Sequence, residues 1–239
     1  HFMQKEIHEQ VRSVTDTLAG RVDFHSGKIL LPEIKLTSIE AKCINKIVIT
    51  GCGTAAYAGM VGKYLLERIS RIPCEVVIGS EFRYSDPIVD KNDILLAISQ
   101  SGETADTLAA MEEGKRKNAR IWSIVNVMGS QATRFSDVSI SMQTGPEIGV
   151  ASTKAFTAPL VDLYMIAILL ADLRGILSDS HRKSLVNDLR LLPDLIGRTL
   201  EREPDVLVHG HVRVQRVVLE HHRDVTVLRF DVVHDAIAD

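Results

Sequence analysis

From Lys46 onward the sequence alternates short apolar runs with longer helical patterns, and this alternation constrains the fold more than any other feature. Because strands alternate with helices, we expect a parallel sheet with right-handed crossovers. The fold class expected is α/β, a three-layer doubly wound parallel sheet of flavodoxin or Rossmann type over about residues 35–175. The expected strands are Lys46–Thr50, Cys74–Ser80, Asp93–Ser99, Arg120–Asn126 and Asp137–Met142. The first four are rich in Ile and Val, as expected for strands in a sheet that is covered on both faces. The expected helices are Thr54–Ser70, Thr104–Lys117, Thr153–Asp172 and Ser180–Glu201.

An amphipathic helix is predicted over residues 4–20, before the alternation begins. Its apolar residues Ile7, Val11, Val14 and Leu18 are spaced by four, three and four positions, and Gly20 is suited to end it. A looser segment follows, and a short helix is expected over residues 36–43.

Composition excludes several classes of protein. The 239 residues correspond to about 1.6 domains. A net charge of −3 argues against a nucleic-acid-binding or membrane-surface protein, which would need a basic face. Cys43, Cys52 and Cys74 are too few for a disulfide framework, so a cytoplasmic location is expected. The apolar stretch Ala155–Ala171 is interrupted by Asp162 and falls short of the roughly 18 apolar residues of a membrane span.

The composition changes near residue 203. From Pro204 to Asp239 valine occurs ten times, and lysine is absent after Lys183. The tail contains two β-like runs, Asp205–Val218 and Asp224–Val233. Its histidines and one nearby carboxylate suggest a metal site, but their spacing is undefined, and an exposed polar face or non-native sequence explains them better. These residues are His209, His211, His221, His222, Asp231 and His234.

The clearest candidate site is the hydroxyl-rich loop after the third expected strand. Ser99, Gln100, Ser101 and Thr104 surround Gly102 at the start of a helix. A helix N-terminus offers unpaired N–H groups and about half a positive charge, which favours a phosphate. The alternative is that a Ser or Thr only caps the helix, although capping needs one hydroxyl and three are present.

Two further loops follow other expected strands or precede a helix. Cys52, Gly53 and Thr54 follow the first strand, with glycines that allow close approach of a ligand. The third glycine of a dinucleotide fingerprint is Ala56 here, so a nucleotide cofactor is not indicated, and Cys52 is interpreted as a small buried thiol. The third loop, residues 145–154, contains Glu147 and Lys154, which could meet a sugar hydroxyl or a phosphate, or lie in solvent.

Together these segments resemble the isomerising glutamine–fructose-6-phosphate aminotransferase family, also called glucosamine-6-phosphate synthase. The residues that carry the resemblance are 99–108, 147–156, 52–54, 80–83 and 1–7, and it extends over about residues 1–203. Members of the family have an N-terminal glutaminase domain and two sugar-isomerase (SIS) domains, and they act in hexosamine biosynthesis. The resemblance assigns residues 1–34 to the linker, 35–203 to the first SIS domain with its exit helix, and 204–239 to a divergent tail replacing the start of a second SIS domain.

The resemblance also implies site residues. Ser99, Gln100, Ser101 and Thr104 would bind the phosphate of fructose 6-phosphate or glucosamine 6-phosphate. The sugar would lie beside residues of the other two loops, which are Cys52, Gly53, Thr54, Val150, Ala151 and Ser152. A family serine is Ala55 here, so one hydroxyl is lost. No metal or other cofactor is implied, and a homodimer formed through the SIS domain is expected, with Ala155–Asp172 as a candidate surface.

The isolated chain is expected to bind the sugar phosphate without synthase activity. In the family the glutaminase cysteine belongs to the glutaminase domain. The isomerase base, the ring-opening lysine and a histidine belong to the second SIS domain, and the resemblance covers neither of these domains. An acid–base isomerisation needs such a group within reach of the carbon-bound proton. The alternative is a non-catalytic SIS-domain sensor of sugar phosphates, favoured if residues 204–239 pack as strands against the domain. A dinucleotide-dependent oxidoreductase is disfavoured by the missing glycine.

Overall fold

The computed structural model describes residues 2–202, 217–218 and 229–230 of the chain. These residues fall into two units, 1–196 and 197–239, which are described separately. The division of the chain proposed from its composition and its resemblance remains a prediction.

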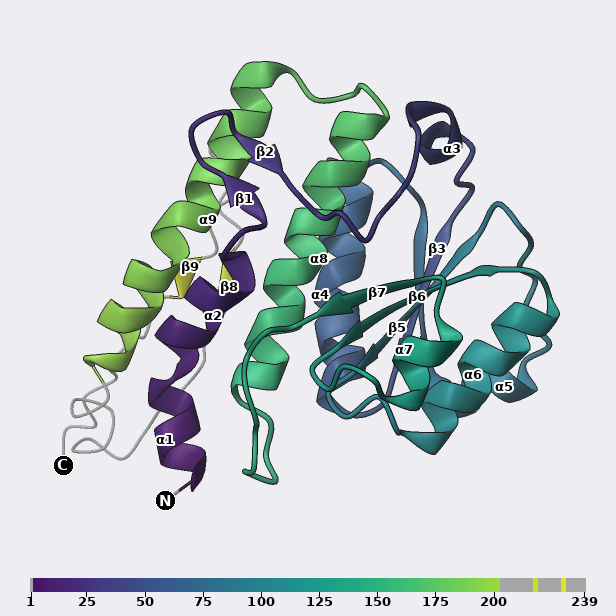
Figure 1. Ribbon diagram of the computed structural model, residues 1–239, viewed down its shortest axis with the longest axis horizontal. Coiled ribbons are helices and arrows are strands. Elements are labelled where there is room, and N and C mark those ends of the chain that lie inside the picture. Colours follow the sequence, from purple (N-terminus) through teal and green to yellow (C-terminus); the bar gives the residue numbers. More distant parts are fainter. Residues whose placement is uncertain (1, 203–216, 219–228, 231–239) are drawn as a thin grey trace, which may run out of the picture. The chain divides into compact units, whose positions relative to one another are not determined.

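A five-stranded parallel sheet forms the centre of the first unit (Figure 1). Its order is β4-β3-β5-β6-β7, the order of a flavodoxin-like sheet, so the predicted α/β class is confirmed. The chain reverses direction across the sheet between β3 and β5, which is the switch point where ligands bind in such folds. The strands are β3 (Ile47–Gly51), β4 (Cys74–Ile78), β5 (Ile94–Ser99), β6 (Arg120–Val125) and β7 (Val138–Ser141).

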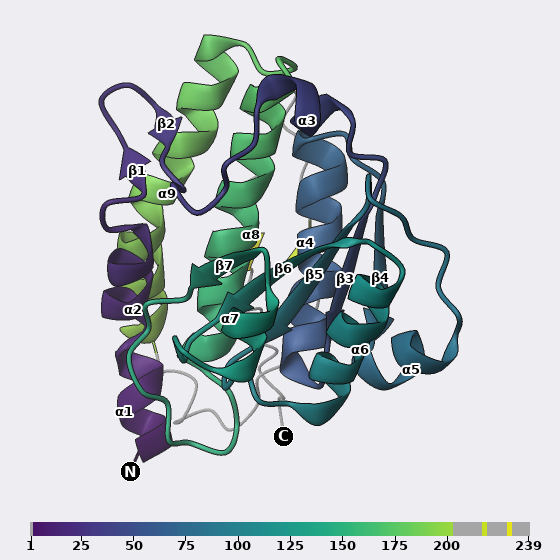
Figure 2. The same ribbon diagram turned by 45° about the vertical axis from the view of Figure 1, so that its right-hand side comes forward.

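Helices cover both faces of this sheet, giving three layers (Figure 2). Side chains alternate along each strand, so Ile49 packs in the core beneath α4 (Thr54–Ile69) and α8 (Lys154–Leu173), whereas Val48 packs in the opposite core. The second face is covered by α5 (Gly79–Tyr84), α6 (Ala105–Arg116) and α7 (Gln131–Phe135).

The strand expected over Cys74–Ser80 ends at Ile78, because α5 begins at Gly79. A Cβ at Gly79 would meet the backbone of Asp106 at 3.1 Å, so the glycine allows α5 to approach α6. Neither α5 nor α7 is predicted by the sequence pattern, since helices of six and five residues are too short to show a helical period.

The N-terminal segment packs against the α4–α8 face. The single helix predicted over residues 4–20 is two helices, α1 (Phe2–His8) and α2 (Gln10–Leu18), and Val14 and Leu18 of α2 join the core with α8. A small antiparallel hairpin, β1 (Val22–Asp23) with β2 (Lys28–Ile29), follows them. The remaining helices are α3 (Ser38–Lys42) and α9 (Asp179–Leu200), the last of which continues into the second unit.

Helix α8 is the apolar centre of the first unit. It is long and apolar enough to cross a membrane, but 61% of its most apolar window is buried within the protein, as in the core helix of a globular domain. It packs against α2 and α4, and only Asp162 among its central residues is charged. Most of α8 packs within the monomer, and the use of Ala155–Asp172 as a dimer surface stays a prediction.

The second unit has one described pairing, the antiparallel contact of β8 (Val217–Val218) with β9 (Arg229–Phe230). These strands fall in or at the ends of the expected β-like runs Asp205–Val218 and Asp224–Val233, most of whose residues lie outside the described part of the chain. The same holds for the tail residues considered for a metal, which are His209, His211, His221, His222, Asp231 and His234.

Candidate functional site

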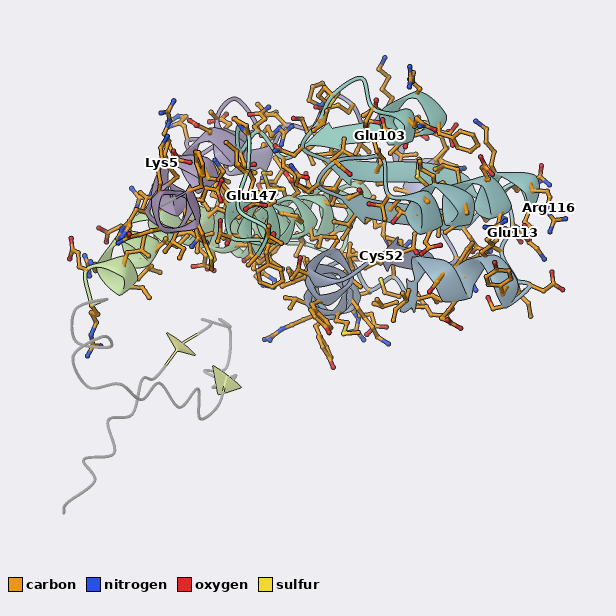
Figure 3. All side chains as sticks on the ribbon, turned by 90° about the horizontal axis from the view of Figure 1, so that it is seen from below. Lys5, Cys52, Glu103, Glu113, Arg116 and Glu147 are labelled. Carbon is orange, nitrogen blue, oxygen red and sulfur yellow. The ribbon has the colours of Figure 1, made fainter. Side chains whose placement is uncertain are left out.

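The candidate site lies at the carboxyl edge of the sheet, on either side of the switch point between β3 and β5. Figure 3 looks from below and labels one residue in each of three loops: Cys52, Glu103 and Glu147. The β3–α4 loop contacts the first turn of α6, which directly follows the β5–α6 loop: the thiol of Cys52 lies 3.7 Å from the hydroxyl of Thr107. The fold thus brings together the first two loops predicted from the sequence.

The β5–α6 loop, residues 99–104, is held in shape by its own hydroxyls. The side chain of Ser99 is buried and its Oγ accepts a hydrogen bond from the N–H of Gly102 (3.0 Å). The Oγ of Ser101 accepts from the N–H of Glu103 (3.2 Å), and Ser99 lies 3.2 Å from the hydroxyl of Thr104. These bonds gather three hydroxyls at the start of α6.

Thr104 is the N-cap residue of α6, yet its side chain makes no capping hydrogen bond. The explanation that this threonine is present only to cap the helix is therefore wrong. The hydroxyl remains half-exposed beside the first turn of a 12-residue helix, whose N-terminus favours a negative charge. The loop can thus offer hydroxyl and N–H donors to an anion.

The β3–α4 loop approaches the same edge through its glycines. Gly53 has φ +58°, and a Cβ at this position would meet nothing within 4 Å, so the surface above it is open. Thr54 is exposed, and Cys52 is only half-buried, not the fully buried thiol that the sequence suggested. These residues form an open wall beside the hydroxyl-rich loop.

The third loop precedes α8, and its glutamate is not a free carboxylate. Glu147 accepts hydrogen bonds from the N–H of Thr153 (2.8 Å) and of Ala155 (3.2 Å), and so caps α8. Lys154 is buried and donates to Glu9 (2.7 Å), so neither residue is free for a substrate. The sugar-side residues expected in this loop, Val150, Ala151 and Ser152, are exposed or half-exposed.

Asn126, at the end of β6, connects the third loop to the phosphate loop. Its N–H donates to the carbonyl of Gln100 (3.1 Å), and its side-chain amide donates to the carbonyl of Gly145 (2.7 Å). Sequence analysis did not single it out, although its position just after a strand places it at the carboxyl edge of the sheet.

Glu6 on α1 is a second residue that sequence analysis missed. It is 3% exposed, and its carboxylate accepts from the N–H groups of Ile148 (2.6 Å) and Gly149 (3.0 Å). The N-terminal helix therefore holds the third loop in place. Nothing in the local sequence pattern indicates this contact, because its partners are more than 140 positions apart.

A cavity of about 290 Å³ lies between α1, α2 and the third loop. Its lining includes Lys5, Glu9 and Arg12, and no residue of the phosphate loop. The charges in its wall are largely paired with one another, as in the contacts of Lys5 and Lys154 with Glu9. We therefore do not assign the cavity to the sugar-phosphate site.

The SIS domain family model matches residues 41–169, more than half of the chain. The chain belongs to the SIS domain family. The match covers both loops at the switch point and the start of α8, so the candidate site of this SIS domain is built from the shared part of the fold.

The chain is similar to proteins of the aminotransferase family that its sequence resembles. The isomerising glutamine–fructose-6-phosphate aminotransferase of Symbiobacterium thermophilum is 46% identical over 206 residues, 86% of this chain and 34% of that protein. The solved C-terminal domain of glucosamine–fructose-6-phosphate aminotransferase from Francisella tularensis is 36% identical, with a TM-score of 0.81 over 87% of this chain and 58% of that one. A glucosamine-6-phosphate deaminase from Thermotoga maritima, 18% identical with a TM-score of 0.63 over 90% of this chain and 59% of that one, shares the fold. This SIS domain thus spans about a third of the length of the curated relatives it matches.

Proposed function

We propose that this chain binds fructose 6-phosphate or glucosamine 6-phosphate as the SIS part of an isomerising glutamine–fructose-6-phosphate aminotransferase. The observation that carries the proposal is the group of three hydroxyls at the start of α6, where Thr104 leaves its capping role unused. The aminotransferase relatives at 46% identity support the choice of ligand.

The phosphate is placed in the loop of residues 99–104. Ser101 and Thr104 donate through their hydroxyls, Gln100 through its carboxamide, and Ser99 shapes the loop from beneath. The loop contains no Lys or Arg, so the phosphate is held by hydrogen bonds and the end of α6 rather than by an ion pair. The sugar ring then lies beside residues 52–54 and 150–152.

We also propose that the chain binds its ligand without catalysing isomerisation. A general base must lie within hydrogen-bond reach of the proton it removes. The carboxylates of the two loops, Glu103 and Glu147, both accept hydrogen bonds from protein N–H groups. The proposed binding needs no metal, and in the described part of the chain no three potential ligands converge on one point.

Calorimetric titration with fructose 6-phosphate tests the binding. We expect saturable binding with a dissociation constant in the range of about 0.1–10 mM, and a roughly tenfold loss for Thr104→Ala because one donor to a charged group is removed. The matched control is Thr15→Ala at an exposed position of α2, where the hydroxyl donates to the carbonyl of Val11 and should not affect affinity. Absence of saturable binding at several times 10 mM would disprove the proposal.

The absence of synthase chemistry is tested separately. The chain is incubated with fructose 6-phosphate and ammonia, and glucosamine 6-phosphate is assayed. Any product above the protein-free background contradicts the proposal that the chain only binds. A homodimer formed through the SIS domain and a cytoplasmic location are further parts of the proposal, the former tested by sedimentation equilibrium.

A further inference from the structure

The phosphate loop contains an acidic residue, Glu103, between Gly102 and Thr104. A free carboxylate at this place would repel a bound phosphate, because like charges at short range disfavour each other. The residue is exposed, so burial does not explain its presence either.

The carboxylate of Glu103 is turned away from the loop and onto α7. Its Oε1 accepts from the backbone N–H of Gln131 (2.8 Å), and its Oε2 accepts from the side-chain amide of the same residue (2.7 Å). Both oxygens are therefore engaged by one residue at the start of α7. The two hydrogen bonds fix the direction of the side chain as well as its position.

Neighbouring contacts attach the same part of the loop to α7. The carbonyl of Gly102 accepts from the N–H of Ala132 (3.0 Å). Gly102 itself lies against Ser130, where an added Cβ would come within 2.1 Å of the Ser130 Oγ. Glu103 thus completes a three-bond attachment of the loop to residues 131 and 132, which supports the hydroxyls of Ser101 and Thr104 from behind.

We propose that Glu103 is a positioning residue for the phosphate: it holds the loop in its binding shape by accepting two hydrogen bonds from Gln131, and it does not touch the ligand. This inference rests on the proposed function of the loop. It assigns to the glutamate a role opposite to the one its charge alone would suggest.

The two roles predict opposite effects for the variant Glu103→Gln. If the charge of Glu103 only repels the phosphate, removing it strengthens binding. If the carboxylate positions the loop, its two charge-assisted hydrogen bonds become neutral amide bonds, with the side-chain amide of Gln131 turned to present its oxygen, and binding weakens. We expect a roughly three- to tenfold weaker affinity for fructose 6-phosphate, because a hydrogen bond to a charged group is about twice as strong as a neutral one.

The double variant Glu103→Gln, Gln131→Glu provides a rescue. The carbonyl of the amide at 103 accepts from the backbone N–H at 131, and its NH₂ group donates to the new carboxylate. A charge-assisted hydrogen bond between the two side chains is thereby restored, and the net charge of the chain is that of the native protein. We expect its affinity to return to within about twofold of the native value, because a carboxylate again ties residue 103 to residue 131.

Titration of the native chain and the variants with fructose 6-phosphate decides the question, with Glu112→Gln, an exposed charge elsewhere on α6, as the control for lost charge. Weaker binding by Glu103→Gln, recovery in the double variant and unchanged thermal midpoints support positioning. Equal or tighter binding by Glu103→Gln overturns it, as does failure of a folded double variant to recover. If the native chain itself does not bind, the proposed function has failed instead.

Discussion

At the scale of single residues, Gly102 shows how narrowly the phosphate loop is shaped. Its φ of +67° lies in the left-handed region, which side chains disfavour. The space at its Cα is closed as well, since Ser130 is close enough to exclude a Cβ. Two independent restrictions therefore require glycine between Ser101 and Glu103.

We predict that Gly102→Ala weakens fructose 6-phosphate binding and lowers the free energy of unfolding. The left-handed backbone alone costs about 1 kcal/mol for a non-glycine residue, and overlap with Ser130 adds a further ~1–3 kcal/mol. Urea unfolding and calorimetric titration measure the two effects.

The matched control is Gly20→Ala, which has a similar φ of +73° but no atom within 4 Å of the added Cβ. It should show only the backbone cost and no loss of binding. Adding Ser130→Gly to Gly102→Ala should restore part of the stability. Equal destabilisation by Gly102→Ala and Gly20→Ala would show that the overlap is relieved without cost.

At the scale of elements, α1, α2 and the residue between them contact the third loop and the start of α8 through polar side chains. Glu6 accepts from the backbone of the loop, and Glu9 pairs with buried Lys154, whose hydrogen bond holds the pKa of the Glu9 carboxyl below its ordinary value. Gln10 bonds Thr157 one turn further along α8. A segment that resembles only a linker thus contributes to the wall of the candidate site.

We predict that Glu6→Ala releases residues 148 and 149. Their N–H groups lose a shared acceptor, so their amide hydrogen exchange should become at least about tenfold faster, while that of β3 stays unchanged. Gln4→Ala, on the exposed side of the same helix, is the control. Unchanged exchange at Ile148 and Gly149 in Glu6→Ala would mean that the loop keeps its shape without α1.

At the scale of the whole first unit, a buried hydrogen bond between Arg21 and Asp162 joins the N-terminal segment to the central helix. Arg21, just after α2, donates to Asp162 on α8 (3.1 Å), and both side chains are almost completely inaccessible. Burial raises the pKa of Asp162 to about 8, and the charge of Arg21 opposes this rise. The second oxygen of Asp162 has no partner.

This pair predicts how stability depends on pH. Between the ordinary pKa of 3.8 and about 8, the folded state holds a proton on Asp162 that the unfolded state has released. The contribution of Asp162 to the free energy of unfolding therefore falls as pH rises through this window, by at most on the order of 1 kcal/mol per pH unit, and levels off above it.

Urea unfolding of the native chain and of Asp162→Asn at pH 5 to 9 measures this contribution. The asparagine variant should gain stability relative to the native chain as pH rises to about 8. Glu112→Gln, which removes an exposed carboxylate, should instead run parallel to the native curve. Parallel curves for Asp162→Asn as well would indicate that Arg21 keeps Asp162 ionised throughout.

Much of the fold was predictable from local patterns. The strands at 47–51 and 94–99 are continuous apolar runs, and α4 and α6 show a helical period, so both sequence and structure place Cys52 and Ser99 at strand ends. Residues at the carboxyl ends of parallel strands share one edge of the sheet, and for this reason the sequence predicts that two of the three site loops lie near each other.

The strand order, the short helices and the partners of charged side chains were decided by the tertiary structure. The sequence shows a glutamate at 6, 103 and 147, but not that each one accepts hydrogen bonds from backbone N–H groups. Local periodicity reports which face of an element is buried, whereas a hydrogen bond across 28 or 142 positions depends on how the elements pack. The sequence therefore determined the elements and the chemistry of the loops, and packing alone decided which polar groups remain free to bind a ligand.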